Sequence, residues 1–348
     1  MSLRSFAAMN VVLRIGLTAI AGVALVVSLT SQSLLRAQPP QMAGRPNLRL
    51  PDEAAGIDEI VRTLISAFDQ VDIVALGEAH LRRSDSDLRI ALIRNSDFAK
   101  KVRFIVVEFG STTEQSILDR YIRGENVSTA ELQHVWKTTT QAANSIWDSP
   151  IYAEFFAAVR DVNSKLPAHS RIRVLGGDPG PRDNRSRETA ALSVLKEQVL
   201  QKRGKALLIY GAAHFYLTGP PDYLAGMGED IGLASKLEME YPGRTLAVIR
   251  ISALDRPPPV KADIDPDYEK FDRVLKTRVR PVLLPLQRLP FRDFTAEEFL
   301  GRTLTNCRGA GGCRSVFKGS TLTLGQMADA CVYFGRGPDA VVQPTPGG

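Results

Sequence analysis

The sequence predicts an α/β fold, with a mostly parallel sheet flanked by helices on both faces, in a single large domain that follows an N-terminal export segment. Three observations support this prediction. Short apolar runs alternate along the chain with stretches of helical periodicity. The runs are continuously apolar, as expected of strands that are buried on both faces. The chain has 348 residues, of which 44% are hydrophobic and 24% charged, and this allows a sizeable core.

The first 37 residues have the pattern of an export signal. Arg4 and Arg14 form a basic region, and residues 15–29 form an uncharged apolar run that is shorter than a membrane span. The segment Leu35-Arg36-Ala37 is a poor cleavage site, so an uncleaved membrane anchor is the alternative. We therefore expect an exported protein, periplasmic, extracellular or membrane-anchored, with a linker over residues 38–53.

The predicted domain spans residues 54–335 and begins with a helix over Ala54–Phe68. Ser111 with Glu114, and Ser128 with Glu131, have the spacing of capping boxes and predict two helix starts. Further helices are predicted over residues 152–162 and 189–201. Strands are predicted over residues 71–76, 103–109, 171–175, 205–210, 245–251 and 281–286.

The last part of the chain gives three weaker predictions. Pro257-Pro258-Pro259 predicts a surface loop over residues 255–267, since prolines cannot pair within a central strand. Cys307 and Cys313 bracket a glycine-rich stretch, and an exported chain permits a disulfide between them, whereas Cys331 in an apolar run is expected to be a buried thiol. Residues 336–348 are rich in glycine and proline and are expected to form a flexible tail.

The charge of the chain excludes one class of partner. The net charge of +6 includes Arg4, Arg14 and Arg36, and without these three there are 41 basic against 38 acidic residues. No dense basic block with interleaved aromatic residues occurs, so nucleic-acid binding is not expected. A small-molecule or peptide substrate is expected instead, with membrane association only through the N-terminal segment.

Candidate site residues follow four of the predicted strands. Glu78 and His80 follow the first strand, Glu108 lies at the end of the second, and Asp178 and His214 follow the next two. Ligands of open α/β sheets bind beyond the carboxyl ends of the strands. Two of the four histidines follow a strand at the same spacing, in Gly77-Glu78-Ala79-His80 and Gly211-Ala212-Ala213-His214. A glycine there lets the chain turn sharply, so that the following side chains point into the crevice.

These residue types allow two kinds of chemistry, which the residues alone do not separate. His80, Glu108 and His214, with Asp178 as a further ligand, could bind a divalent metal that keeps an open position for water. Without a metal, the candidate catalytic set is His80, Glu78, Glu108 and His214, in which carboxylates orient a histidine as general base.

Other polar residues have simpler interpretations. His134 and His169 look like surface residues, and Arg82, Arg83, Arg185 and Arg187 are more simply solvated than bound to an anionic substrate. A phosphate-binding loop, a Gly-x-Gly-x-x-Gly motif and a Gly-x-Ser-x-Gly motif are all absent from the sequence, which disfavours a serine hydrolase of the common α/β type.

The ordered set of motifs resembles the Tiki/TraB, ChaN and erythromycin-esterase superfamily, with ChaN-like members the most similar. The shared pattern is Gly-x-x-His, a glutamate at the end of the next strand, and a second Gly-x-x-His, and it covers residues 71–219. His80, Glu108 and His214 match the pattern, and Glu78 matches the esterase and ChaN forms. Within this range, residues 118–125, Ser128, Leu132, Trp136 and 183–188 also look like the family. A weaker likeness lies near the C-terminus, at Asp329-Ala330 and Tyr333-Phe334-Gly335.

The resemblance implies alternative activities. Tiki-type members are regarded as metal-dependent peptidases, erythromycin esterases hydrolyse a lactone, and ChaN-type members are associated with haem or iron uptake. Leu81-Arg82-Arg83 stands where the family has polar residues after the first histidine, which leaves the substrate open. We therefore expect an exported hydrolase of an ester or peptide bond, with a divalent metal as a candidate cofactor. The alternative is a haem- or iron-binding uptake protein without turnover.

Overall fold

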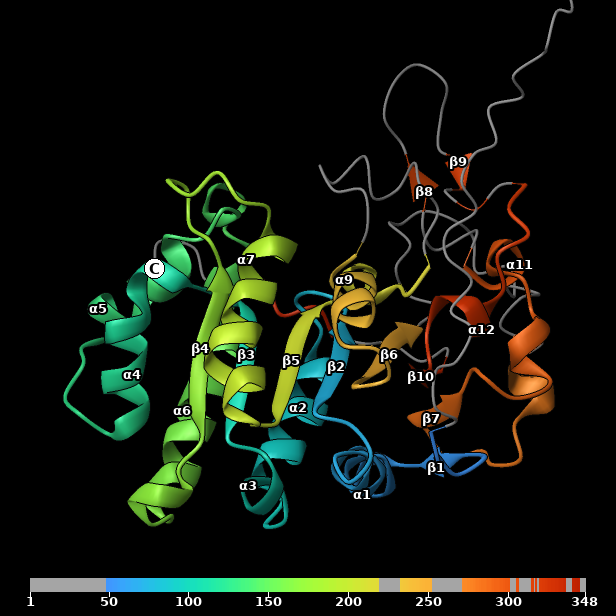
Figure 1. Cartoon of the computed structure of the whole chain (residues 1–348), viewed down its shortest axis with the longest axis horizontal. Helices are drawn as coiled ribbons and strands as arrows, with labels where there is room; N and C mark the ends of the chain where they lie inside the picture. Colours follow the sequence, from blue (N-terminus) through green and yellow to red (C-terminus); the bar gives the residue numbers. More distant parts are fainter. Residues whose placement is uncertain are drawn as a thin grey trace, which may run out of the picture. The chain divides into compact units, whose positions relative to one another are not determined.

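The computed structural model describes residues 48–218, 232–251, 271–300, 305–306, 314–315, 317, 319–335 and 340–344. These residues belong to one compact unit, residues 43–348. Within it an eight-stranded sheet has the order β1-β7-β10-β6-β2-β5-β3-β4 (Figure 1). Its strands are β1 (Ala54–Ala55), β2 (Ile73–Glu78), β3 (Phe104–Ser111), β4 (Arg173–Asp178), β5 (Ala206–Gly211), β6 (Thr245–Ile251), β7 (Val282–Pro285) and β10 (Ala330–Tyr333).

The sheet is mostly parallel, which confirms the predicted fold class. Neighbouring strands from β10 through β6, β2, β5 and β3 to β4 all run in the same direction. The exceptions lie at one edge, where β7 is antiparallel to both β10 and β1. The run at 281–286 was predicted as a strand without a direction, whereas β1 and β10 were not predicted as strands.

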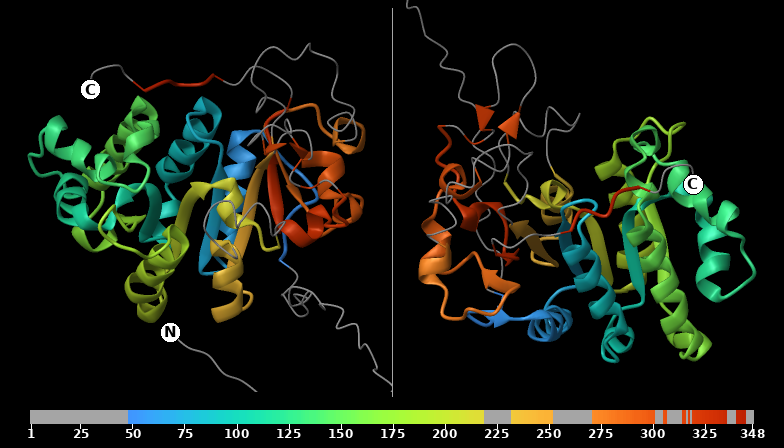
Figure 2. Two further views of the ribbon diagram at one scale, coloured as in Figure 1. Left: turned by 90° about the horizontal axis from the view of Figure 1, so that it is seen from above. Right: turned by 180° about the vertical axis from the view of Figure 1, so that it is seen from behind.

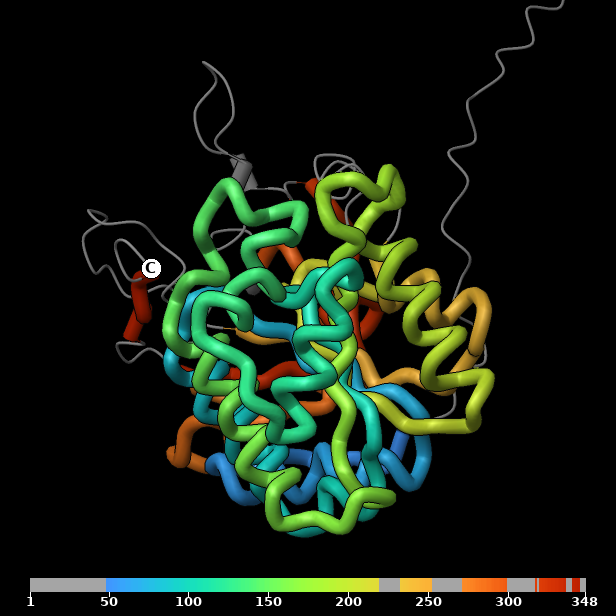
Figure 3. The backbone as a smooth tube through the Cα atoms, turned by 90° about the vertical axis from the view of Figure 1, so that its left-hand side faces the viewer, coloured from blue at the N-terminus to red at the C-terminus, as the bar shows by residue number. Residues whose placement is uncertain are grey.

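Helices cover both faces of the sheet. The helices α1 (Ile57–Ala67), α2 (Arg83–Arg94) and α6 (Pro150–Ser164) lie on one face, and α7 (Arg187–Val194) and α9 (Leu233–Glu240) lie on the other (Figure 2, left panel). Figure 3 views the unit from the side of α4 (Gln115–Arg123) and α5 (Thr129–Lys137), next to the edge strand β4. The remaining described helices are α3 (Phe98–Lys101), α11 (Ala296–Leu300), α12 (Leu324–Met327) and the 3-10 turns. A small separate pair joins β8 (Thr305–Asn306) and β9 (Arg314–Ser315).

The helix starts follow local chemistry, with one difference from the prediction. The Ser128 hydroxyl accepts a hydrogen bond from the Glu131 amide at the start of α5, as its spacing predicted. Ser111 instead accepts from the Thr113 amide and begins a 3-10 turn, Thr112–Glu114, before α4. The helix predicted over residues 189–201 begins two residues earlier and changes at Leu195–Val199 into a π-helical turn.

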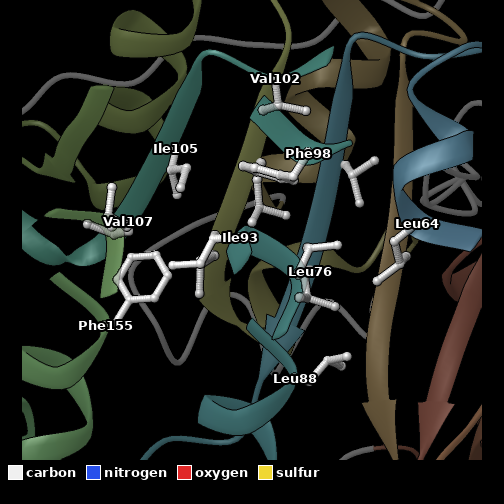
Figure 4. Packing of buried hydrophobic residues seen from close by; sticks show 14 of the residues in the cluster. Leu64, Leu76, Leu88, Ile93, Phe98, Val102, Ile105, Val107 and Phe155 are labelled. Carbon is white, nitrogen blue, oxygen red and sulfur yellow. The ribbon is translucent and has the colours of Figure 1, made fainter. Parts of the chain in front are cut away.

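The core lies between the sheet and the α1, α2 and α6 layer (Figure 4). Leu76 and Val107 of the central strands pack there with helix residues such as Leu88 and Phe155, and all four are buried. The continuous apolar runs of the strands are thus explained by burial on both faces. Because the core fixes these strands, the polar residues at their carboxyl ends are held in fixed relative positions.

Several predictions concern residues outside the described ranges. The export segment 1–37, the Pro257–Pro259 loop and the Cys307–Cys313 bridge all lie there. Cys331 is described and is a buried free thiol on β10, as expected, and burial raises the pKa of this thiol. Of the tail predicted to be flexible, residues 340–344 are described and contact the domain. Within the described ranges, no helix is both long and apolar enough to cross a membrane.

Candidate active site

The carboxyl ends of the parallel strands bring both Gly-x-x-His motifs to one place. Glu78 ends β2, Gly211 ends β5, and Glu108 of β3 directly follows Val107, the last residue of β3 that pairs with β5. His214 follows β5 in the 3-10 turn Ala212–Phe215. The motifs follow the adjacent strands β2 and β5, and Glu108 of β3, on the other side of β5, lies close to both histidines, 3.8 Å from His80 and 3.3 Å from His214.

Glu108 is the centre of this group and is almost fully buried. Its Oε1 accepts a hydrogen bond from Nη1 of Arg187 at 2.5 Å and lies 3.3 Å from Nε2 of His214. Its Oε2 accepts from the Gly211 amide at 2.8 Å. Burial, which raises the pKa of a carboxyl, is outweighed by the charges of His214, His80 and Arg187, so the pKa of Glu108 lies well below its usual value. Glu108 is therefore an ionised carboxylate that organises its neighbours, and it is a weak base.

His214 is enclosed between two carboxylates. Its Nε2 faces Glu108, and its Nδ1 lies 2.5 Å from Oε1 of Glu188 at the start of α7. Burial lowers the pKa of an imidazole, but the charges of Glu108 and Glu188 and the hydrogen bonds to both outweigh it and raise the pKa of His214 to about 9. His214 is thus a buried cation at neutral pH, with both ring nitrogens donating.

His80 is more exposed, with 24% of its side chain accessible against 3% for His214. Its Nδ1 lies 3.1 Å from Oε1 of Glu78, and an ionised carboxylate only accepts, so Nδ1 carries the proton. Its Nε2 is 3.8 Å from Oε2 of Glu108, too far for a hydrogen bond. In the neutral ring, Nε2 therefore carries the lone pair.

Glu78, the hydrogen-bond partner of His80, is an ionised carboxylate. It accepts hydrogen bonds from Arg89 and from the Tyr152 hydroxyl, the latter at 3.2 Å. Burial raises the pKa of this carboxyl, but the charge of Arg89 and the bond to His80 outweigh it and leave the pKa of Glu78 lowered. The Arg89 guanidinium lies over the rings of Phe109, Tyr152 and Phe155 at 5.2, 4.9 and 5.5 Å.

The carboxylates of Glu78 and Glu108 raise the pKa of His80. Burial lowers it, but the bond to Glu78 and the charges of Glu108 and Glu78 outweigh burial, while the charge of His214 opposes them. The two histidines, identical in motif, therefore differ in chemistry. His214 is a fixed positive charge, and His80 is the more exposed histidine of the two.

The glycines of the two motifs allow this close approach. A Cβ on Gly211 would lie 3.0 Å from Cε1 and 3.1 Å from Nε2 of His80. A Cβ on Gly77 would lie 2.8 Å from the Ala212 Cα. Each glycine thus leaves room for a residue of the other motif. The glycines therefore allow the two motifs to pack closely, in addition to allowing the chain to turn.

Asp178 does not join the predicted metal ligands. It accepts hydrogen bonds from the amide and hydroxyl of Thr140 and from the Gly180 amide. Burial, which outweighs these bonds, raises the pKa of Asp178. Glu108 is already paired with a cation of the chain, Arg187. Within the described ranges, no three His, Cys, Asp or Glu side chains are arranged to hold a metal ion, and the set His80, Glu108, His214 and Asp178 does not fit one.

Several residues of the site were not singled out in the sequence. Glu188 lies in the first turn of α7, after β4, and thus at the same edge of the sheet. Arg89 occupies a buried position of α2 among Leu88 and Leu92, and a lone arginine on an apolar face was the available signal. Arg187 was expected to be solvated rather than bound to a substrate anion, whereas the structure pairs it with the buried Glu108. His134 and His169 are exposed, as expected.

Comparisons with known proteins describe the chain at the level of its fold. No family model matches the sequence, and no curated protein matches it. Similar solved structures include a Bacillus cereus protein, 11% identical over 83% of this chain and 94% of that one, with a TM-score of 0.55. A succinoglycan biosynthesis protein is 11% identical over 86% and 96%, with a TM-score of 0.56.

A third similar structure has a lower TM-score. An erythromycin esterase in its open conformation is 12% identical over 83% of this chain and 96% of that chain, with a TM-score of 0.48. At such identities the first two structures support the fold alone, and the third likeness is too low to carry an argument. The activity must therefore be argued from the site itself.

Proposed function

We propose that the chain is a hydrolase of an ester bond in a small molecule, with His80 as general base and Glu78 as the residue that orients it. The observation that carries this proposal is the imidazole of His80, which is 24% exposed, holds its Nδ1–H 3.1 Å from Glu78 and keeps Nε2 beyond hydrogen-bond distance of Glu108. A partly exposed imidazole next to a buried orienting carboxylate is the arrangement that general-base catalysis needs.

The step balances with groups of this chain and one water molecule. Nε2 of His80 takes a proton from the water molecule while the water oxygen bonds to the ester carbonyl carbon. The carbon–oxygen bond to the alcohol then breaks, and the leaving oxygen takes the proton back from His80. Glu78 stabilises the imidazolium formed between these events.

Positive charge is available for the oxyanion that develops on the carbonyl oxygen. Arg187 is 18% exposed, and its hydrogen bond to Glu108 uses only Nη1 of the guanidinium donors. We propose that the other donors bind the oxyanion. The buried cation His214 stabilises Glu108 and thereby the position of Arg187. Such preorganised donors are a large part of the catalysis of acyl transfer.

We propose in addition that the protein acts outside the cytoplasm, because the apolar segment at residues 15–29 follows Arg4 and Arg14. N-terminal sequencing of protein from the periplasmic fraction and the medium tests this. A protein that remains in the cytoplasm with Met1 retained would contradict export.

A panel of aryl esters and lactones, assayed with purified protein, tests the proposed hydrolysis. His80→Ala is expected to lower kcat/KM by about 100-fold or more, the usual contribution of a general base. Glu78→Gln should lower it as well. The controls His134→Ala and His169→Ala remove exposed histidines and should keep full activity. Hydrolysis that persists in His80→Ala would refute the assignment of the base.

The alternative function, haem or iron binding without turnover, would use Nε2 of His80 as an iron ligand. Titration of the wild-type protein with haem separates the two. A Soret band that depends on His80 together with absent ester hydrolysis would replace the hydrolase proposal. Ester hydrolysis without a haem spectrum would support it.

A further inference from the structure

Residues 340–344, here called the C-terminal strap, pair with the chain directly after His80. The Arg83 amide donates to the Ala340 carbonyl at 2.9 Å, and the Val342 amide donates to the Leu81 carbonyl at 2.8 Å. Arg82 and Val341 form the antiparallel bridge between these bonds. In Figure 2 (left panel) the strap is the red segment that runs along the outer side of the α2 and α6 layer.

A second anchor fixes the strap to the start of α6. The Ser149 hydroxyl donates to the Val342 carbonyl at 2.5 Å, and Ser149 is buried. This hydroxyl makes no capping bond to its own helix, so its described hydrogen bond is to the strap. The Val342 side chain packs with Leu81 against the core, whereas Val341 is 43% exposed. Val342 therefore carries the attachment through both its backbone and its side chain.

The strap is hydrogen-bonded to Leu81, a residue with a strained backbone conformation. Leu81 has φ of 67°, in the left-handed region that a leucine adopts only when its surroundings impose it. Its amide donates to the Tyr152 hydroxyl at 3.2 Å, and its carbonyl accepts from the strap. The Tyr152 hydroxyl in turn donates to Glu78, the partner of His80. Both backbone polar groups of Leu81 are thus occupied, one by α6 and one by the strap.

We infer that the C-terminal strap is a positioning element of the site, which holds Leu81 in its strained conformation and thereby fixes the His80 ring on Glu78. His80 and Leu81 are adjacent, so relaxation of Leu81 turns the peptide that carries the ring. A ring that leaves Glu78 loses the orientation of Nε2. The consequence for activity rests on the proposed function, whereas the consequence for the titration of His80 does not.

Val342→Pro tests the inference because proline has no amide hydrogen to donate to Leu81. NMR titration of the His80 ring in the full-length protein is the first measurement. We expect its pKa in this variant to shift from the raised value towards the ordinary value near 6.5, as the bond to Glu78 loosens. We also expect kcat for the ester to fall about tenfold with KM little changed, since misplacement of a catalytic group costs rate.

Matched variants isolate the lost bond. Val342→Ile keeps the amide and the apolar contact, and Val341→Ala changes an exposed neighbour, so both should titrate like the wild type. Ser149→Ala removes only the second anchor and should shift the His80 titration in the same direction by less. The double variant Val342→Pro with Ser149→Ala should be no worse than Val342→Pro, because both changes release one segment.

The outcomes remain separate from those of the hydrolase proposal. If no ester is hydrolysed, the proposed function fails, and the NMR titration alone decides on the strap. If Val342→Pro does not fold, Ser149→Ala decides. If Val342→Pro folds and its His80 titrates as in the wild type, the inference is overturned. If Val342→Pro does not fold, the same titration in a folded Ser149→Ala overturns it.

Discussion

Gly211 and His80, the glycine of one motif and the histidine of the other, are in contact: a Cβ on Gly211 would lie 3.0 Å from Cε1 and 3.1 Å from Nε2 of the His80 ring. The contact involves the nitrogen that we propose as the base. The Gly211 amide meanwhile donates to Glu108. One glycine therefore places the central carboxylate and leaves room for the reactive imidazole.

Gly211→Ala is expected to damage the site more than the fold. Gly211 has φ of −52° and ψ of 137°, which alanine adopts freely, and the added methyl meets the His80 ring. We expect kcat/KM to fall at least about tenfold, with the free energy of unfolding changed by less than about 1 kcal/mol. Enzyme assays and urea denaturation measure the two effects. Full activity in Gly211→Ala would show that the contact is unimportant.

Gly77→Ala provides the contrast. Its methyl would lie 2.8 Å from the Ala212 Cα and 3.0 Å from the Val248 carbonyl oxygen, and both are backbone atoms. Backbone moves less easily than a ring, so we expect about 1–3 kcal/mol of destabilisation, the usual range for overpacking. Urea denaturation of Gly211→Ala and Gly77→Ala side by side checks that Gly77→Ala is the more destabilised variant. Equal destabilisation in the two would contradict it.

Activity should rise with pH. His80 acts as a base only when neutral, and its pKa is raised, mainly because the bond to Glu78 and the charge of Glu108 outweigh burial. The half-maximal pH of kcat/KM is therefore expected above 6.5, measured between about pH 5 and 9. Glu78→Gln removes the charge and weakens the bond, so the midpoint should move to lower pH as the rate falls. A midpoint that moves upward would contradict this account.

Stability should fall on the alkaline side through His214. Its pKa is about 9 in the folded protein against 6.5 for an ordinary histidine, so its contribution is complete below pH 6.5 and is lost as pH rises towards 9. The contribution is on the order of 3 kcal/mol. The difference in unfolding free energy between wild type and His214→Gln should therefore shrink over this range. Denaturation curves at several pH values test it, and a constant difference would refute the assignment.

Arg89→Ala should destabilise the protein strongly. Arg89 is buried and pairs with the buried Glu78, so its removal leaves an uncompensated carboxylate and a gap among three aromatic rings. Breaking a buried pair in this way costs about 3–5 kcal/mol. Arg94→Ala, an exposed arginine later in α2, should stay within about 0.5 kcal/mol of the wild type. Thermal denaturation of the two variants should separate them clearly, and similar melting temperatures would argue against the buried pair.

The sequence by itself determined the strand–helix alternation and the strand ends that carry Glu78, Glu108 and His214. Continuous apolar runs are local signals, and parallel strands place their carboxyl ends at one edge whatever their order. The strand Thr245–Ile251 was predicted with its observed bounds. By contrast, the four-residue strand Ala330–Tyr333 was recognised only as an apolar run around Cys331, because its pairing with β6 and β7 is made by residues distant in the sequence.

Only the tertiary structure decided that the two histidines differ. Their motifs are alike, but His214 lies between Glu108 and Glu188, while His80 bonds Glu78 and keeps its other nitrogen beyond hydrogen-bond distance of Glu108. The protonation of an imidazole depends on charges and burial within a few ångströms, which come from other strands and helices. The same reason explains why Arg89, Glu188 and the strap were not foreseen. Each acts through a partner far away in the sequence, and no local pattern records such a contact.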